Sequence, residues 1–311
     1  MRMTGNVMYV MAVVAGVLQA QQITILDIDV ENTVQYVGDV ADSTKLATVP
    51  TSTLPAATRA FTDTIVIGDI VAVNGKPAKG TWSSRQYRMA FNPSPQPGFA
   101  IADVSQVTIS ECKWEILNAE GAFIGRFMDG GFFPHAISGG TGAFLGVRGE
   151  MRGGVHPDPI PTRVASMLED PGYRRVNGGG RTRVRHSLVP LFVPAVDPAG
   201  IWHADFSPVS AVSPARPGEI LILRAMNLGP TTPDLSPGQP FPTGTMHIVN
   251  APVEVSIGGQ PAEVLNQVGW PGAAGIYRVD VRVPAGVATN VAPLQLTAAW
   301  IRAAEITLPM K

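Results

Sequence analysis

This chain is poor in cysteine and has almost no net charge. Its 311 residues include one cysteine, Cys112, so the chain can form neither an internal disulfide nor a cysteine-based metal cluster. Its 23 Lys and Arg residues balance 24 Asp and Glu residues. Such a chain is not a general nucleic-acid binder, which would carry a basic excess. We interpret Cys112 as a small buried side chain, with a nucleophile as the alternative.

Charged residues are sparse as well, at 15%, whereas hydrophobic residues make up 45%. This apolar content excludes a disordered chain. The 33 glycines and 28 prolines exclude a coiled coil or a helical repeat, which would be rich in Ala, Glu, Lys and Leu. The length predicts about two domains.

Long apolar runs are missing. A short one at residues 7–18 follows a single charge, Arg2, and Leu18-Gln19-Ala20 before Gln21 is a plausible cleavage site. The run is too short to span a bilayer comfortably. We predict that residues 1–20 are a signal peptide and that the mature chain is secreted, extracellular or periplasmic, without a transmembrane span. An uncleaved anchor or a buried first strand is the alternative.

Residues 23–151 carry the signals of β-strands. Runs of β-branched residues at 65–67 and 70–73 precede Asn74-Gly75, a strong tight-turn signal. Further strand-like stretches occur at 80–91, 101–117, 122–128 and 143–151. Several strands with short turns and no convincing helix predict a barrel or a sandwich.

Residues 153–204 are expected to form a connector rich in Arg, Gly and Pro. Its arginines form a possible anion patch for an anionic polymer or a lipid headgroup. The alternative is that they pair with acidic residues of the same chain or stay solvated. Glycines 178–180 are not followed by Lys-Ser/Thr, which excludes a phosphate-binding P-loop. The patch consists of Arg174, Arg175, Arg181, Arg183 and Arg185.

Residues 205–311 are predicted to be a second all-β unit. In 276–283, charged residues alternate with Tyr277, Val279, Val281 and Val283, which indicates a strand with one apolar face. With the neighbouring strand-like segments, this unit would close a sandwich of about seven short strands.

Two segments resemble known families. The segment 133–150 resembles the Gly-Gly-Thr-Gly-x-Phe…Arg-Gly signature of dirigent and allene oxide cyclase-like barrels. The resemblance implies an antiparallel eight-stranded barrel with an apolar cavity, often oligomeric, that guides or catalyses cyclisation or coupling of small apolar molecules. No catalytic residue of those families aligns to a position in this chain. The matching residues are Gly139, Gly140, Thr141, Gly142, Phe144, Arg148 and Gly149.

The second resemblance covers residues 205–311. The segments 256–264 and 275–287 are similar to an immunoglobulin-like module of the IPT/TIG type, and closer still to a C-terminal domain of secreted soil-bacterial proteins. This resemblance implies an extracellular β-sandwich that acts as an accessory or spacer, with no catalytic residues to transfer.

Strand alternation selects a candidate barrel pocket. Cys112 and Trp114 share the apolar face of 110–116, Arg85 and Tyr87 fall on the apolar face of 81–91, and Asp69 falls on that of 65–73. A buried Asp69 needs a partner, which Arg85 can supply, and it could serve as a general acid or base. The alternative is a structural Asp69–Arg85 pair, or a register slip that exposes both. Asp69→Asn is expected to abolish ligand-dependent activity while the fold is kept.

No pattern in the sequence indicates a metal site or another cofactor. The five histidines are scattered, without the spacing of a zinc motif. His135, beside Pro134, is interpreted as a structural or loop residue. Asp27, Asp29 and Glu31 alternate in one run, which is interpreted as a solvated strand face rather than a calcium site.

The sequence therefore predicts a secreted all-β protein. An antiparallel eight-stranded β-barrel at 23–152 and the connector precede an immunoglobulin-like β-sandwich. We expect the barrel to bind a small apolar ligand or a surface partner, and its resemblance to dirigent-type barrels implies a homo-oligomer. The alternatives are a cofactor-independent cyclase or isomerase acting in the barrel, and a purely structural extracellular protein. A barrel filled by Trp114, Phe123 and Phe127 would leave no room for a ligand.

Overall fold

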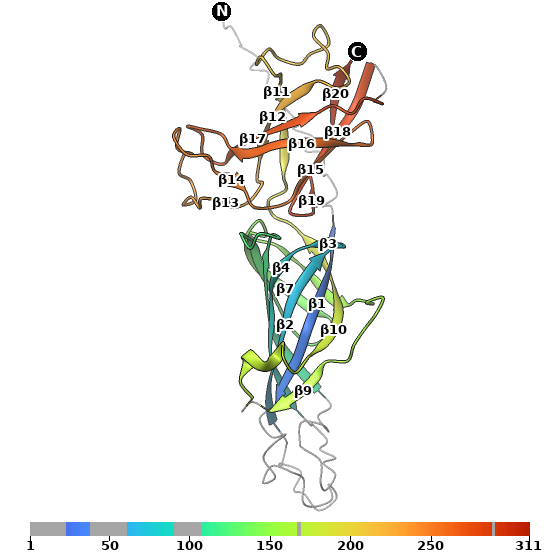
Figure 1. Cartoon of the computed structure of the whole chain (residues 1–311), viewed down its shortest axis with the longest axis vertical. Coiled ribbons are helices and arrows are strands. Elements are labelled where there is room, and N and C mark those ends of the chain that lie inside the picture. Colours follow the sequence, from blue (N-terminus) through green and yellow to red (C-terminus); the bar gives the residue numbers. More distant parts are fainter. Residues whose placement is uncertain (1–22, 38–60, 90–106, 167–168, 288–289) are drawn as a thin grey trace, which may run out of the picture.

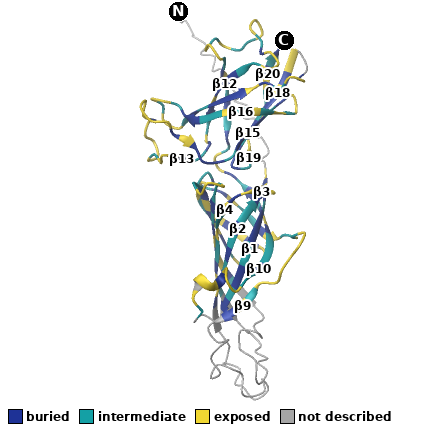
Figure 2. Ribbon diagram, viewed as in Figure 1, coloured by how far each residue is buried: buried dark blue, intermediate teal, exposed yellow. Residues whose placement is uncertain are grey.

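The computed structural model describes residues 23–37, 61–89, 107–166, 169–287 and 290–311. These residues are almost entirely β-structure, arranged as a closed barrel followed by a second, curled sheet (Figure 1). The predicted all-β fold is confirmed, and buried residues occur along the strands of both units (Figure 2). The predicted signal peptide lies outside the described residues.

Eight antiparallel strands form the barrel, and β1 closes it by pairing with β2 on one side and β10 on the other. The short β3 (Lys76–Pro77) pairs with β2, and β9 (Arg163–Ser166) runs parallel to β1. A single-turn 3-10 helix, η4 (Pro171–Arg174), follows β9. The eight strands are β1 (Thr24–Val37), β2 (Phe61–Val73), β4 (Lys79–Met89), β5 (Val107–Leu117), β6 (Phe123–Gly131), β7 (His135–Gly142), β8 (Arg148–Gly153) and β10 (Gly180–Val189).

Local sequence explains two of these features. Asn74 and Gly75 both have positive φ, 50° and 75°, as a two-residue hairpin turn requires, and they join β2 to β3 as predicted. In β5, Cys112, Trp114 and Ile116 are buried, whereas the residues between them face outward. Period-two alternation thus fixes which face of β5 turns into the barrel.

The expected connector, residues 153–204, is corrected by the structure. It contains β10, which pairs with β8 and β1 and therefore completes the barrel. Val184, His186 and Leu188 point inward there, and arginines occupy the alternate positions. Three arginines of the predicted basic cluster, Arg181, Arg183 and Arg185, therefore lie on one face of β10, whereas Arg174 and Arg175 lie at the end of η4.

The second unit begins earlier than residue 205, at β11 (Ala195–His203). Strand β16 (Gln260–Gly269) joins its two halves, because its first residues pair with β15 and most of its length pairs with β17. In β17, Tyr277, Val279 and Val281 are buried, as the alternation predicts. The other strands are β12 (Ile220–Met226), β13 (Thr231–Thr232), β14 (Ile248–Val249), β15 (Val253–Ile257), β17 (Ile276–Arg282), β18 (Asn290–Ala298), β19 (Ile301–Arg302) and β20 (Ile306–Met310).

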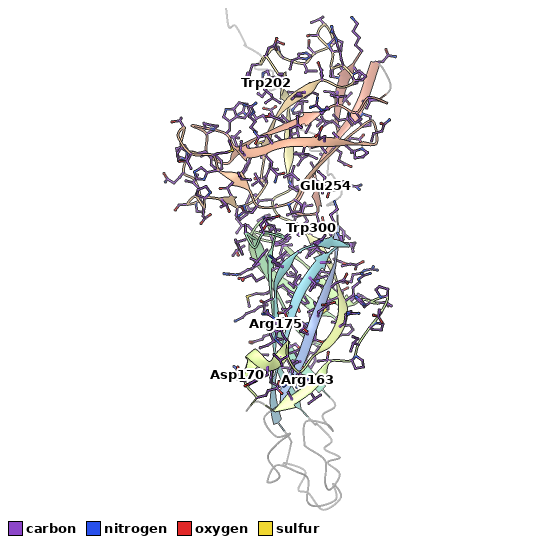
Figure 3. The ribbon with its side chains drawn as sticks, viewed as in Figure 1. Arg163, Asp170, Arg175, Trp202, Glu254 and Trp300 are labelled. Carbon is purple, nitrogen blue, oxygen red and sulfur yellow. The ribbon has the colours of Figure 1, made fainter. Side chains whose placement is uncertain are left out.

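Polar contacts join the two units end to end. Asn250 Nδ2 donates to the carbonyl of Phe123 at 2.9 Å, and Asn118 Nδ2 donates to the carbonyl of Asn250 at 3.2 Å. Lys76 forms an ion pair with Glu254, which lies close to the junction in Figure 3. These contacts cap the β3 end of the barrel with the second unit.

Candidate functional site

The structure does not bring the five residues of the predicted pocket together. Cys112 and Trp114 are 1% and 0% exposed and point into the barrel. Arg85 is exposed, and Asp69 lies on the outer wall between the buried residues 68 and 70. The side chain of Tyr87 lies outside the described residues. The predicted pocket is therefore divided between the two sides of the barrel wall.

The inward face of β2 is the opposite of the one predicted near Asp69. Val66 and Ile70 are buried, whereas Ile65 is 40% exposed. A shift of one residue exchanges the two faces of a strand, and the β1–β2 pairing is irregular at two places. Asp69 lies opposite Thr81, whereas Arg85 lies opposite Ile65. The predicted Asp69–Arg85 pair is wrong.

Asp69 is held instead by arginines at the end of η4. Its Oδ1 accepts hydrogen bonds from Arg174 at 2.8 Å and Arg175 at 3.0 Å, and its Oδ2 accepts from Arg175 at 2.9 Å and Asn32 at 3.0 Å. Burial raises the pKa of Asp69, but these hydrogen bonds outweigh it and lower the pKa to about 2. Asp69 therefore anchors η4 to the wall; a carboxyl so acidic is a poor general acid or base at neutral pH.

The remaining arginines of the predicted anion patch form a cross-strand ladder with β1. The β1–β10 register places Asp27 opposite Arg185 and Asp29 opposite Arg183. Nε of each arginine donates to its partner's carboxylate, at 2.7 and 2.6 Å. Arg181 pairs with Glu31 at 3.0 Å, and also with Asp158. All five arginines of the patch are thus paired with acids of their own chain. This is the alternative that the sequence left open to an anion-binding patch.

The ladder predicts graded losses of stability. Arg185→Ala removes a half-exposed ion pair, so it should lower the free energy of unfolding only slightly, and less than Arg183→Ala does. Arg183→Ala should cost about 1–2 kcal/mol, because the Asp29 side chain left behind is only 12% exposed. Urea denaturation at low salt and at about 1 M NaCl measures both, and salt should abolish only the first loss. Equal losses in the two variants would contradict the ladder.

The glycine-rich signature spans the second half of β7, the turn that carries Phe144, and the start of β8. Gly149 cannot carry a side chain, since its φ is 148° and a Cβ would lie 2.0 Å from the carbonyl oxygen of Ser187. Phe144 is buried inside the barrel, and Arg148 is exposed. The signature therefore contributes close strand packing and one core aromatic ring.

Aromatic rings fill the middle of the barrel. The Trp114 ring stacks on Trp82 at 5.3 Å and on Phe127 at 6.1 Å between centroids. The edge of Phe127 meets Phe144 at 5.4 Å, and the His186 ring meets Trp114 at 4.5 Å. Trp114 and Phe127 are fully buried, as a filled barrel requires, whereas Phe123 is partly exposed.

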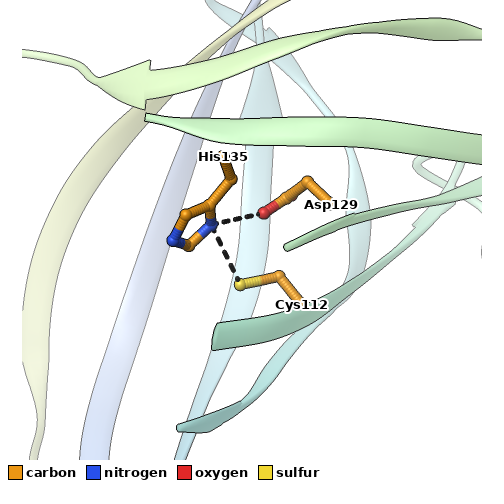
Figure 4. A group of neighbouring side chains, drawn as sticks. All are labelled: Cys112, Asp129 and His135. Carbon is orange, nitrogen blue, oxygen red and sulfur yellow. Dashed lines mark hydrogen bonds and ion pairs between the residues drawn. The ribbon is translucent and has the colours of Figure 1, made fainter. Parts of the chain in front are cut away.

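A buried polar cluster lies beside this aromatic layer (Figure 4). Asp129, 2% exposed, accepts hydrogen bonds from Trp114 Nε1 at 2.5 Å and from His135 Nδ1 at 2.7 Å. Cys112 Sγ lies 3.7 Å from the same Nδ1 and donates to Ser84 Oγ at 3.3 Å. Burial raises the pKa of Asp129, but hydrogen bonding from His135 outweighs it and holds the pKa well below its usual range. Asp129 is thus a buried carboxylate.

The cluster is not a nucleophilic triad. Cys112 Sγ and Asp129 Oδ1 both approach Nδ1 of His135, whereas a triad needs the nucleophile and the acid on different ring nitrogens. Burial, reinforced by the charge of Asp129, raises the pKa of the Cys112 thiol to about 12, so the reactive thiolate is scarce. The interpretation of Cys112 as a buried side chain is confirmed.

His186 completes the cluster. It is 0% exposed, and neither ring nitrogen has a hydrogen-bond partner among the described residues. Its Nε2 lies 3.6 Å from Asp129 Oδ2, too far for a hydrogen bond. Sequence analysis missed Asp129 and His186 as inward residues. Alternation from Phe127 in β6 and from Val184 in β10 is the signal that would have found them.

An open groove of about 660 Å³ crosses the outer wall of β4–β7. Gly139 and Gly140 line the groove and leave space in it because they carry no side chains. Met128, 46% exposed, adds an apolar surface. Lys113 and Arg126 bring positive charge, and Arg126 pairs with Glu115. The remaining lining residues are Thr81, Ser83, Trp114, Phe127, Ser138 and Thr141.

Sequence analysis also missed a Ser–His–Glu arrangement in the second unit. His203 Nδ1 lies 3.2 Å from Glu219 Oε2, and Nε2 lies 3.2 Å from both the hydroxyl and the carbonyl oxygen of Ser213. A nitrogen that faces a carbonyl oxygen is suited to donate rather than to accept a hydroxyl proton. We therefore interpret His203 as an anchor for the loop that carries Ser213.

In comparisons with known proteins, no family model, no curated protein and no solved structure matches the chain. The fold and the site thus define a class only, an all-β protein with a closed barrel and an outer groove. In the part of the chain that the structure describes, no helix has the length and apolar character of a membrane span.

Proposed function

We propose that this chain is a secreted binding protein whose barrel takes a small, largely apolar ligand in the outer groove over β4–β7. The groove itself is the observation that carries the proposal. The second unit is then an accessory domain, in keeping with its resemblance to immunoglobulin-like modules. Secretion rests on the N-terminal sequence alone.

The lining of the groove favours this class of ligand. Met128 offers apolar surface, Gly139 and Gly140 leave space beside it, and the hydroxyl groups of Thr81 and Ser83 offer hydrogen bonds. Lys113 offers a positive charge to an anionic group. Ligand sites commonly combine a mostly apolar surface with a few polar groups that fix orientation.

The proposed position of the ligand differs from the one that the sequence predicts. Aromatic rings occupy the middle of the barrel, so we place the ligand outside rather than inside. The cyclase alternative gains no support from Asp129, which lies behind the barrel wall and not in the groove. A second copy of the chain seated in the groove is the rival occupant.

Filling the groove should weaken binding without unfolding the barrel. A Cβ on Gly139 would meet only Arg148 Nη1, at 3.3 Å, the flexible end of a side chain. We expect Gly139→Leu to weaken binding of anilinonaphthalene sulfonate, an apolar probe with one anionic group, by about tenfold or more, which is about 1.4 kcal/mol. Fluorescence titration measures this.

Gly153→Leu is the matched control, because its added Cβ would meet only Phe133, at 3.9 Å, away from the groove lining. It should bind the probe like the wild type. Circular dichroism confirms that all three proteins are folded. Equal probe binding by the two leucine variants would refute the groove, and concentration-dependent dimerisation that Gly139→Leu abolishes would favour a second copy as its occupant.

A further inference from the structure

We propose that the polar cluster inside the barrel is a zinc site, with Cys112, Asp129, His135 and His186 as its four ligands. This inference does not depend on the outer groove. It rests on the convergence of a sulfur, an imidazole nitrogen and a carboxylate oxygen in the barrel interior.

Three potential ligand atoms already lie close together inside the barrel. Cys112 Sγ, Asp129 Oδ1 and His135 Nδ1 come from the neighbouring strands β5, β6 and β7 and lie within 4.8 Å of one another (Figure 4). Tetrahedral zinc with ordinary bond lengths holds a sulfur and a nitrogen about 3.6 Å apart. The observed Sγ–Nδ1 distance is 3.7 Å. The 2.7 Å hydrogen bond from His135 to Asp129 would open to about 3.4 Å as the metal replaces the shared proton.

His186 supplies the second, independent observation. A fully buried imidazole with no hydrogen-bond partner is costly, because each buried polar group that stays unsatisfied carries a desolvation penalty. Its Nε2 lies 3.6 Å from Asp129 Oδ2, outside the group of three whose ligand atoms are all within 4.8 Å of one another, so the ring would shift toward the ion on binding. A metal ion would satisfy that nitrogen, which no described protein group does.

The surroundings fit a closed structural site. Trp114 Nε1 holds Asp129 Oδ2, which leaves Oδ1 for the metal, and Ser84 Oγ lies 3.3 Å from Cys112 Sγ. Outer contacts of this kind orient metal ligands. On binding, the Cys112 thiol releases its proton to water. His135 gives up its Nδ1 proton to solvent and takes one up at Nε2, so its ring stays neutral. One thiolate and one carboxylate then balance the two charges of the cation. Four protein ligands leave no open position for substrate.

Metal analysis of the full chain tests the site. After equilibration with micromolar Zn²⁺ and dialysis into metal-free buffer, the wild type should retain about one zinc per chain. Cys112→Ser and His135→Gln should each lower the affinity at least tenfold, and His186→Gln should do so as well. His247→Gln is the control, because His247 is also buried but lies in the second unit, where its Nδ1 is 2.8 Å from the carbonyl oxygen of Pro233. It should keep the zinc.

Cobalt substitution keeps the test decisive even if the variants fail to fold. Co²⁺ bound to the wild type should show the near-ultraviolet charge-transfer band of a cobalt–thiolate bond and the intense visible bands of tetrahedral cobalt. A wild type that retains no zinc would overturn the proposal. So would variants that keep it, or a cobalt spectrum without the thiolate band.

Discussion

Replacing Trp114 by alanine should destabilise the barrel by about 4–5 kcal/mol, a large share of the stability of a typical domain. The side chain is fully buried and packs on the rings of Trp82, Phe127 and His186. Removing a buried aromatic ring of this size costs about 3–5 kcal/mol through lost transfer energy and the cavity left behind. Loss of the hydrogen bond to Asp129 adds to it, because the acceptor is a buried carboxylate.

Trp114→Phe separates the two contributions. It keeps a ring in the stack but removes the indole N–H, so we expect a loss of about 2 kcal/mol. Trp202→Phe is the matched control: Trp202 is only partly buried and its ring is tilted against that of Trp270 in the second unit, and the loss should stay below about 1 kcal/mol. Hydrogen exchange of β5 and β12 peptides in increasing urea reports the two units separately. Similar losses for Trp114→Phe and Trp114→Ala would contradict the packing argument.

Asp69→Ala should be the second large effect, at about 3 kcal/mol. It leaves Arg174 nearly buried, with only a 3.4 Å hydrogen bond to the carbonyl of Asn32 and with Nε unsatisfied among the described residues. Removing one partner of a buried ion pair costs about 3–5 kcal/mol because the other charge stays desolvated. Arg175→Ala should cost less than about 1 kcal/mol, since its side chain is 70% exposed.

The lowered pKa of Asp69 also makes the stability of the protein depend on pH. The folded pKa of Asp69, about 2, is below its ordinary value of 3.8, so its contribution is fully present above pH 5 and is lost as the pH falls from about 4 to 2. The contribution amounts to about 2 kcal/mol. Urea midpoints measured between pH 6 and 2 should fall less steeply in Asp69→Asn than in the wild type. Parallel curves would show that the arginine clamp is not formed in solution.

The sequence predicts the fold well wherever alternation is regular. The buried face of β5, with Cys112 and Trp114, and that of β17, with Val279, follow directly from period two. Alternation failed in β2, where pairing irregularities put Asp69 on the outside, and in β10, where arginines on the outer face hide the inward Val184 and Leu188.

The candidate sites were harder to predict because they depend on closure of the barrel. Asp129 and His186 come from β6 and β10, far apart in the sequence, and lie side by side only once the barrel has closed. The groove depends on the absence of side chains at Gly139 and Gly140, which the sequence presents as a strand signature rather than a surface. Neither arrangement has a spacing motif.

The most direct test of the proposed function is native mass spectrometry of the wild type and Gly139→Leu, each purified from the producing organism. We predict that the wild type carries a small apolar molecule that is lost on unfolding and is absent from Gly139→Leu. A wild-type mass equal to that of the bare polypeptide, or the same molecule on both proteins, would contradict a ligand site in the outer groove.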